Sequence, residues 1–448
     1  MNAVLTREHG EPAMLDELAV DVVARARRGG ADAVEVSISA GEGLGVTVRN
    51  GACETVEYER DKGLAVTVYL GGRKGTATTS DFSPAALAES IAAAQAIAEQ
   101  AEPDACAGLA DPRFLARVVP DLDLDHPWAL DVDAAVELAL ECERAALAAD
   151  ARLKQSDGCS VNRYRGTRAY ANSHGFHAAY RGTRHGISSV MIAADAQGMQ
   201  RGYWYTSARR PGELEAAASV GATAARRTVA KLGARKIATT TLPVLFDSRI
   251  AGGLFGHLVG AISGSAQYRR ASFLQDALGE EVLAAHVSLA EEPHLPAALG
   301  SAPFDADGVA TSAKAVVERG RLATYLLGAY SARRLGRDPT GNAGGVHNLI
   351  ASHGARDLEA LIASLPRALL VTDLMGFGVN GVTGDYSRGA SGFLIEHGEL
   401  AHPVEEITIA GNLKTMFRNI VEIGNDVDRR GTIHTGSILI DDMAIAGT

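Results

Sequence analysis

Hydrophobic positions in the first part of the chain change from helical to alternating spacing. Apolar residues three and four apart predict a helix over 12–29. The following residues alternate between apolar and polar, as in half-buried strands, and the dipeptide at 50–51, Asn-Gly, is a strong hairpin signal. An alanine-rich run over 84–101 then predicts a second helix. This part of the chain is therefore expected to form a helix, a meander of strands and a closing helix.

The same order of elements occurs a second time. Helical spacing over 131–149 is followed by strand-like segments around 153–206 and by a predicted helix over 212–232. We therefore predict that residues 1–235 form an N-terminal α/β domain of two similar helix–strand-meander–helix layers.

Residues 236–448 are richer in glycine and in short strand-like runs. Strands are predicted at 308–327 (a strand–turn–strand unit), 367–374, 391–396 and 433–445, and helices at 267–277, 356–364 and 412–422. We predict a strand-rich C-terminal domain with a mixed or barrel-like sheet, so the whole chain belongs to the α+β class.

One stretch of the second half joins a buried strand directly to a glycine-containing helix. Residues 244–246 are apolar, and Asp247 or Ser248 can cap the helix that follows. Four glycines then recur at every fourth position: Gly252, Gly256, Gly260 and Gly264. A glycine costs a helix roughly 1 kcal/mol relative to alanine. Either another part of the protein packs closely against this stripe, which the spacing alone favours, or the helix lines a cavity.

Composition excludes several classes of function. The formal net charge of −11 and the pI near 5.7 argue against a nucleic-acid partner, because phosphate binding needs a basic surface. No run approaches the roughly 20 apolar residues of a membrane span, and the N-terminus has no export signature, so we expect a cytoplasmic protein. The four cysteines form no Cys-x-x-Cys pair, which argues against disulfides and a thiolate zinc site and indicates buried thiols.

Three segments, 330–348, 376–389 and 424–426, carry more glycine and polar residues than a simple fold needs. Such segments let a backbone approach a ligand, but tight turns explain them equally well. His257 has no second histidine at helical spacing, so the residues alone predict no metal site. Ser387 and Asp385 lack an adjacent base, so no catalytic centre is identified from residue chemistry.

The same segments resemble the TldD/PmbA family, and in particular its PmbA branch, also called TldE. The resemblance lies in residues 254–264, 325–333, 340–345, 378–389, 406–413, 419–426 and 435–437, with 46–51 and 63–69 in the first half. It implies a subunit of a bacterial cytoplasmic zinc peptidase, in which TldD supplies the metal and pairs with TldE around an enclosed chamber. That chamber admits unfolded or short peptides, including a peptide-antibiotic precursor and an antitoxin.

The resemblance also implies where a zinc site would lie. The catalytic TldD branch carries a His-Glu-x-x-x-His helix and a later cysteine ligand. In this chain Gly256 and His257 stand at the first His and the Glu, Ala261 stands at the second His, and no cysteine follows Cys159. The resemblance therefore implies that this chain binds no metal and that zinc is held by a TldD-like partner. It also gives the glycine stripe a second role, since the helix can line the partner's chamber or pack at the dimer interface.

We accordingly expect a TldE/PmbA-type subunit that is inactive alone and serves assembly and peptide admission, with exposed strand edges holding a peptide by β-addition. A homodimer of the isolated chain is one open possibility, since the sequence does not determine the oligomeric state. An alternative is a stand-alone homodimeric peptide-binding or adaptor protein without catalysis. A third hypothesis is metal-free hydrolysis by Asp385, Ser387 and Arg388.

The residues expected to line the chamber are the polar ones of the glycine-rich segments and of the helix. They are His257, Asn342, Asn380, Thr383, Asp385, Ser387 and Arg388. Their alternative role is to fix turns and domain contacts by hydrogen bonds, and Asp385 and Arg388 could pair with one another.

Overall fold

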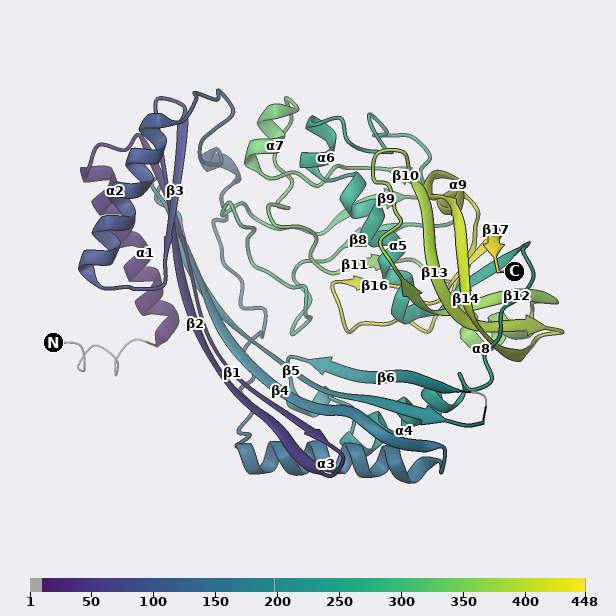
Figure 1. Ribbon diagram of the computed structural model, residues 1–448. Coiled ribbons are helices and arrows are strands. Elements are labelled where there is room, and N and C mark those ends of the chain that lie inside the picture. The colour runs from purple at the N-terminus through teal and green to yellow at the C-terminus, as the bar shows by residue number, and fades with distance from the viewer. Residues whose placement is uncertain (1–9, 197, 448) are drawn as a thin grey trace.

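The computed structural model describes residues 10–196 and 198–447 (Figure 1). Four helices of the first half form where the sequence predicts them: α1 (Glu11–Arg28), α2 (Pro84–Gln100), α3 (Val132–Ala149) and α4 (Ala217–Val229). The last is shorter than predicted, because Pro211–Glu213 form a separate 3-10 turn before it. Asp131 caps α3 through its side chain, and Ser83 caps α2 in the same way.

The strands of the first half form a single antiparallel sheet. Its order is β3 (Arg73–Thr79), β2 (Ala52–Leu70), β1 (Ala33–Arg49), β4 (Leu153–Asn172), β5 (His177–Ala194) and β6 (Met199–Ala208). β1 pairs with β4 at the centre, so the two predicted repeats are adjacent halves of one sheet. The long strands curve strongly, the four helices cover the convex side, and the second half of the chain lies on the concave side (Figure 1).

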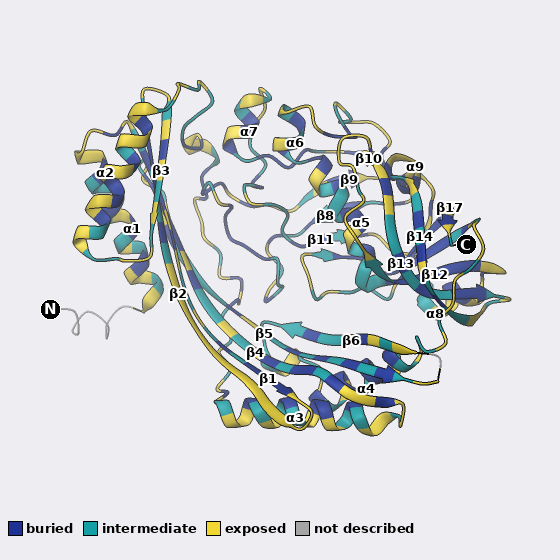
Figure 2. Cartoon of the chain, in the orientation of Figure 1, coloured by how far each residue is buried: buried dark blue, intermediate teal, exposed yellow. Residues whose placement is uncertain are grey.

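The hairpin between β1 and β2 forms at the predicted Asn-Gly pair. Asn50 and Gly51 both have positive φ, 52° and 80°, as a type I′ turn requires. Beyond this turn β2 is exposed over residues 52–62, because β3 pairs only with its later part (Figure 2). Cys53 lies on this exposed stretch and Cys106 is only half-buried, so the expectation of buried thiols is wrong for these two of the four free cysteines.

The second half contains the predicted barrel-like sheet. Its strands are β14 (Glu399–Asn412), β13 (Asp385–Glu396), β12 (Arg367–Met375), β7 (Thr240–Phe246) and β17 (Ile438–Ala446), with β15 (Ile420–Ile423) attached to β17. β14 also pairs with β17, which closes the five strands into a barrel. A smaller sheet has the order β10 (Arg321–Leu322), β9 (Lys314–Glu318), β8 (Leu289–Glu291), β11 (Leu349–Ala351) and β16 (Ile433–His434). The predicted α+β class is confirmed.

The helices of the second half are short. They are α5 (Ser248–Ala261), α6 (Gly264–Tyr268), α7 (Ala329–Arg334), α8 (Leu358–Ala363) and α9 (Leu413–Arg418). The helix predicted over 267–277 is wrong, because α6 ends at Tyr268 and Arg270 adopts a positive φ of 54°. The Ser272 hydroxyl then donates to the Ala261 carbonyl and accepts from the Leu274 amide, which holds this segment as a turn.

One hydrophobic core joins α5 to the barrel. Leu254, Phe255 and Leu258 of α5 are at most 2% exposed and belong to the same buried cluster as Val244 and Phe246 of β7. The apolar face of α5 is therefore fixed against the barrel, and its glycine face points away. No helix in the described part of the chain is long and apolar enough to cross a membrane.

Candidate functional site

Helix α5 is held at its first turn by a buried carboxylate. Asp247 Oδ1 accepts from the Arg249 amide at 3.0 Å, and its two oxygens also accept from the guanidinium groups of Arg249 and Arg227, each at 3.0 Å. Arg227 belongs to α4, so these bonds tie the start of α5 to the first half of the chain. The helix is consequently fixed at its N-terminus and along its apolar face.

The four glycines of the stripe differ in what faces them: one is closely packed, and two face open space. A Cβ atom added at Gly264, the first residue of α6, would lie 2.1 Å from Ser331 Oγ, so tight packing explains this glycine. A Cβ at Gly252 would make only ordinary contact, 3.7 Å from the Ile433 carbonyl oxygen. At Gly256 and Gly260 it would meet nothing within 4 Å. Packing within the chain therefore does not explain these two central glycines, which face open space, and packing at a subunit interface stays a prediction for them.

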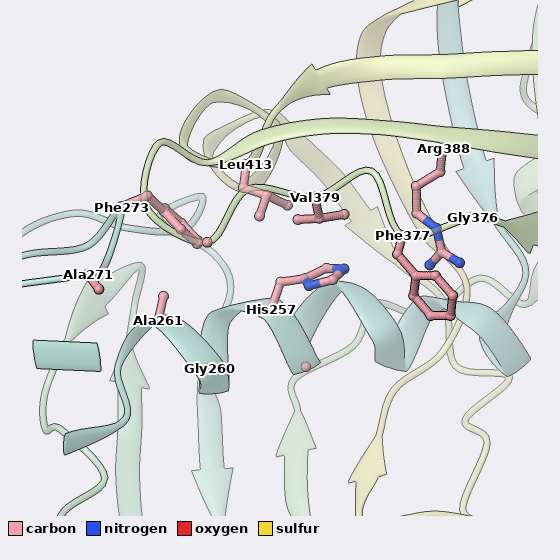
Figure 3. Close-up of a pocket in the computed structure, with 12 residues that line it drawn as sticks. His257, Gly260, Ala261, Ala271, Phe273, Gly376, Phe377, Val379, Arg388 and Leu413 are labelled. Carbon is pink, nitrogen blue, oxygen red and sulfur yellow. The ribbon is translucent and has the colours of Figure 1, made fainter. Parts of the chain in front are cut away.

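That open space is a cavity of about 460 Å³ between α5 and the β12–β13 loop (Figure 3). Its lining comprises Gly256, His257, Gly260, Ala261, Ala271, Phe273, Gly376, Phe377, Val379, Gly381, Arg388 and Leu413. His257 points from α5 into the cavity, and Arg388 reaches toward it from β13 (Figure 3). The volume lies within the range of about 300–1,000 Å³ that is typical of small-ligand sites.

The charge in this cavity comes from arginine. Burial, and after it the positive charge of Arg388, lower the pKa of His257, so its imidazole is neutral at pH 7. The ring packs edge-to-face on Tyr386, with centroids 6.1 Å apart. Tyr386 is 1% exposed, and burial raises its pKa to about 12 despite the nearby Arg388. Among the described lining residues, Arg388 therefore carries the fixed charge, and none is a carboxylate.

The suggested pairing of Asp385 with Arg388 is wrong. The two residues are three positions apart on β13, so their side chains leave opposite faces of the strand. Asp385 accepts instead from Thr383 Oγ1 at 2.6 Å and from Asn412 Nδ2 at 3.1 Å. Ser387 is exposed on the same face as Asp385. The three residues of the metal-free hydrolysis hypothesis therefore do not converge, which removes its geometric basis.

Asn380 and Thr383 shape the β12–β13 loop. The Asn380 side chain accepts from the amides of Val382 and Thr383 at 2.9 and 3.3 Å. The Asn380 amide donates to the Asp385 carbonyl at 2.8 Å, and the hydrogen bond from Thr383, the largest cause, lowers the pKa of Asp385. Of the predicted chamber residues in this loop and in β13, only Arg388 lines the cavity. Asn380, Thr383 and Asp385 instead make turn-fixing side-chain bonds, their alternative role. Ser387 contributes its backbone amide, which donates to the Gly378 carbonyl at 2.7 Å.

Asn342 lies elsewhere, in a buried polar network around Glu291 that sequence reasoning missed. Glu291 is fully buried and accepts from Lys314 Nζ at 2.6 Å, Asn342 Nδ2 at 2.8 Å and the His347 amide at 2.6 Å. Burial alone raises the pKa of Glu291, but the bond from His347 and the charge of Lys314 outweigh it and leave the pKa below its usual value. The network pins the glycine-rich 340–348 segment to β8 and β9.

The cavity residues do not fit a zinc ion. Gly256 and Ala261 offer no donor atom, and His257 alone among the lining residues has an imidazole, whereas zinc needs three or four protein ligands. Arg388 adds a positive charge that opposes a bound cation. The described residues contain no group of three or more His, Cys, Asp or Glu side chains arranged to hold a metal. The chemistry available here is the binding of an anionic and partly apolar ligand.

Comparison with known proteins gives matches along nearly the whole chain. Models of the PmbA/TldA metallopeptidase family match residues 34–98 as domain 1, 125–232 as the central domain and 239–447 as the C-terminal domain. Metalloprotease PmbA of Escherichia coli O157:H7 is 45% identical over 444 residues, 99% of this chain and 98% of the relative. A Metalloprotease PmbA homolog of Haemophilus influenzae is 43% identical over 446 residues, with the same coverage of both chains.

Solved structures share this fold. A crystal structure of a putative modulator of DNA gyrase from Bacteroides thetaiotaomicron has a TM-score of 0.91 at 28% identity, covering 96% of this chain and 98% of that one. TldE from Thermococcus kodakarensis has a TM-score of 0.86 at 21% identity, covering 96% and 100%, and supports the fold alone. With all three domain models matched and identities of 45% and 43% along nearly the full length, the chain belongs to the PmbA/TldA metallopeptidase family.

Proposed function

We propose that this protein is the TldE/PmbA-type subunit of a heteromeric zinc metallopeptidase that degrades or matures unfolded or short peptides. In this proposal the chain binds peptide and a TldD-like subunit holds the zinc and cleaves the bond. The observation that carries the proposal is the cavity over α5, where the glycine-rich segment 376–389 faces a helix that does not carry the ligands of a metal site.

An apolar surface beside the cavity supports a partner subunit. Met375, Phe377 and Val382, at the end of β12 and in the loop after it, are 52%, 101% and 54% exposed. A cluster of exposed large apolar side chains is typical of a surface that another molecule covers. Because Phe377 also lines the cavity, a partner seated here would cover the cavity mouth.

The test measures metal content and cleavage on the same preparations. The purified chain, a TldD-like protein and their mixture are analysed for zinc by mass spectrometry and for cleavage of a quenched fluorescent peptide. We expect less than stoichiometric zinc and no cleavage from this chain alone, and chelator treatment should leave its melting temperature unchanged. Cleavage should appear with the TldD-like protein and be stronger in the mixture than with that protein alone.

Two outcomes would contradict the proposal. One zinc ion per chain with cleavage by the isolated protein would make it an autonomous peptidase. Peptide binding without any association with, or effect on, a TldD-like protein would favour the homodimeric adaptor instead. Sedimentation of the mixture measures that association directly.

A further inference from the structure

Arg388 is a partly buried cation without a carboxylate partner. No carboxylate in the described part of the chain lies within ion-pair distance of its guanidinium. Its buried Nε has no hydrogen-bond partner, and the protein group that interacts with the guanidinium is the neutral hydroxyl of Tyr386, which does not balance its charge. Other arginines that are largely buried are neutralised or bonded: Arg249 pairs with Asp247 at 3.0 Å, and Arg430 pairs with Asp428 at 2.8 Å. A partly desolvated charge left unpaired costs stability, which points to a ligand that completes it.

A second cavity, which Arg388 also lines, does not supply that partner. It has a volume of about 680 Å³ and contains the carboxylates of Asp373, Glu405 and Glu406. Asp373 pairs with Lys231 at 2.9 Å, Glu405 accepts from Gln200 at 2.7 Å, and Glu406 pairs with Lys236 at 2.9 Å. These carboxylates already have partners within the chain, so the charge of Arg388 remains available to the cavity over α5.

The remaining walls of that cavity are apolar. Figure 3 shows Arg388 and Phe377 toward one end of α5, with His257, Val379 and Leu413 in the middle and Phe273 toward the other end. His257 is neutral at pH 7, so the cavity combines one cation with apolar walls. The Tyr386 ring packs edge-to-face on His257, and its hydroxyl interacts with Arg388, whose charge and hydrogen bond lower the Tyr386 pKa against the larger effect of burial.

We propose that this cavity is a receptor for the C-terminal residue of a peptide, with Arg388 binding the terminal carboxylate and Val379 and Leu413, in the middle of the cavity, contacting an apolar side chain. A guanidinium group binds a carboxylate through two parallel hydrogen bonds, which a lysine cannot reproduce. A C-terminal apolar residue carries its charge and its hydrophobic group on one Cα, which matches this lining. The inference rests on the proposed peptide function. It narrows the ligands to peptides that have a free C-terminal carboxylate.

Binding of matched peptides to the full isolated chain tests the inference. The probes carry an uncharged BODIPY dye, which has no carboxylate of its own. They are Ala-Ala-Leu with a free C-terminus, the same peptide as its C-terminal amide, and Ala-Ala-Asp amide, whose only carboxylate is a side chain. We expect fluorescence polarisation to show about tenfold to hundredfold tighter binding of the free acid than of its amide, the range for a charged hydrogen-bonding group. Equal binding of Ala-Ala-Asp amide and the free acid would show that any carboxylate suffices and would overturn terminus recognition.

Arg388→Gln and Arg367→Gln each remove one positive charge, so comparing them separates a specific effect at the cavity from a general effect of lost charge. Arg388→Gln should abolish the preference for the acid, and Arg388→Lys should restore only part of it. Arg367→Gln removes an exposed cation at the start of β12, whose pair with Glu396 spans 3.8 Å, and should keep the full preference. Melting curves establish that each variant is folded.

The proposal is overturned if acid and amide bind equally, if neither binds, or if Arg388→Gln retains the preference. These results are independent of zinc content and of cleavage in the mixture. The receptor can therefore fail while the proposed subunit role stands, and the subunit role can fail while the receptor stands.

Discussion

Replacing single glycines of the stripe by alanine separates a packing role from a cavity role. Gly256 lies inside α5, where an added Cβ meets nothing within 4 Å beyond its own helix. Alanine has the higher helix propensity, so Gly256→Ala should raise the free energy of unfolding by about 0.5–1 kcal/mol. Gly264→Ala should lower it by about 1–3 kcal/mol, the usual cost of overpacking, because the new methyl would lie 2.1 Å from Ser331 Oγ.

Urea denaturation of the isolated chain, followed by tryptophan fluorescence, measures both effects as shifts of the midpoint in opposite directions. A Ser331→Gly change should recover part of the loss in Gly264→Ala, because it removes the two atoms that the methyl would meet at 2.1 and 2.4 Å. Destabilisation by Gly256→Ala of 1 kcal/mol or more would refute the reasoning, since it would mean that this glycine is packed against another part of the chain.

The larger Gly256→Leu change should keep the chain folded but fill the cavity, so peptide binding, measured by fluorescence polarisation, should be abolished. Unchanged binding would place the peptide elsewhere. Glu291→Gln should lower the free energy of unfolding at pH 7 by about 3–5 kcal/mol, because it leaves Lys314 without its carboxylate partner. The difference between variant and parent should shrink as pH falls below about 4, because the parent's Glu291 then becomes protonated too. Burial, then the charge of Asp307, raises the pKa of Asp305 to about 7, so stability should fall as pH rises from about 4 to 7, and Asp307→Asn should flatten that dependence in pH-dependent melting curves. Phe377→Ser should weaken association with a TldD-like subunit in sedimentation without changing the melting temperature, because the ring is fully exposed.

Local sequence signals were sufficient for much of the fold. The Asn50–Gly51 turn follows from the positive φ that this dipeptide accepts, and the helices of the first half follow from apolar spacing. The helix predicted over 267–277 failed because a single left-handed residue, Arg270, and a side-chain bond from Ser272 ended it. Closure of the barrel depends on pairing of residues 408–410 with 444–446, a contact between distant segments that no local pattern encodes.

The candidate site, like the fold, could be predicted from the sequence only in part. Asp385 and Arg388 do not pair because they leave opposite faces of β13, but the sequence predicts this strand only from residue 391, so alternation could not be applied to them. The missing step was local, the position at which one strand begins. By contrast, Glu291, Lys314 and Asn342 come from three segments joined by the smaller sheet, and each looks ordinary in its own context. Spacing could not decide between packing and a cavity for the glycine stripe, because that depends on what faces each glycine.

The charges that line the cavity over α5 determine which ligand it favours: Arg388 has no carboxylate partner, and no lining residue is a carboxylate. A metal site needs negative or neutral donors that converge on a cation. Here the helix supplies glycine and alanine, and the facing strand supplies Arg388, so the electrostatic preference of the cavity is for an anion. The same backbone arrangement that could hold a cation therefore holds a carboxylate more favourably in this chain. Within the proposed complex, one subunit would then grip the charged end of a peptide while the zinc-bearing subunit acts on another part of it.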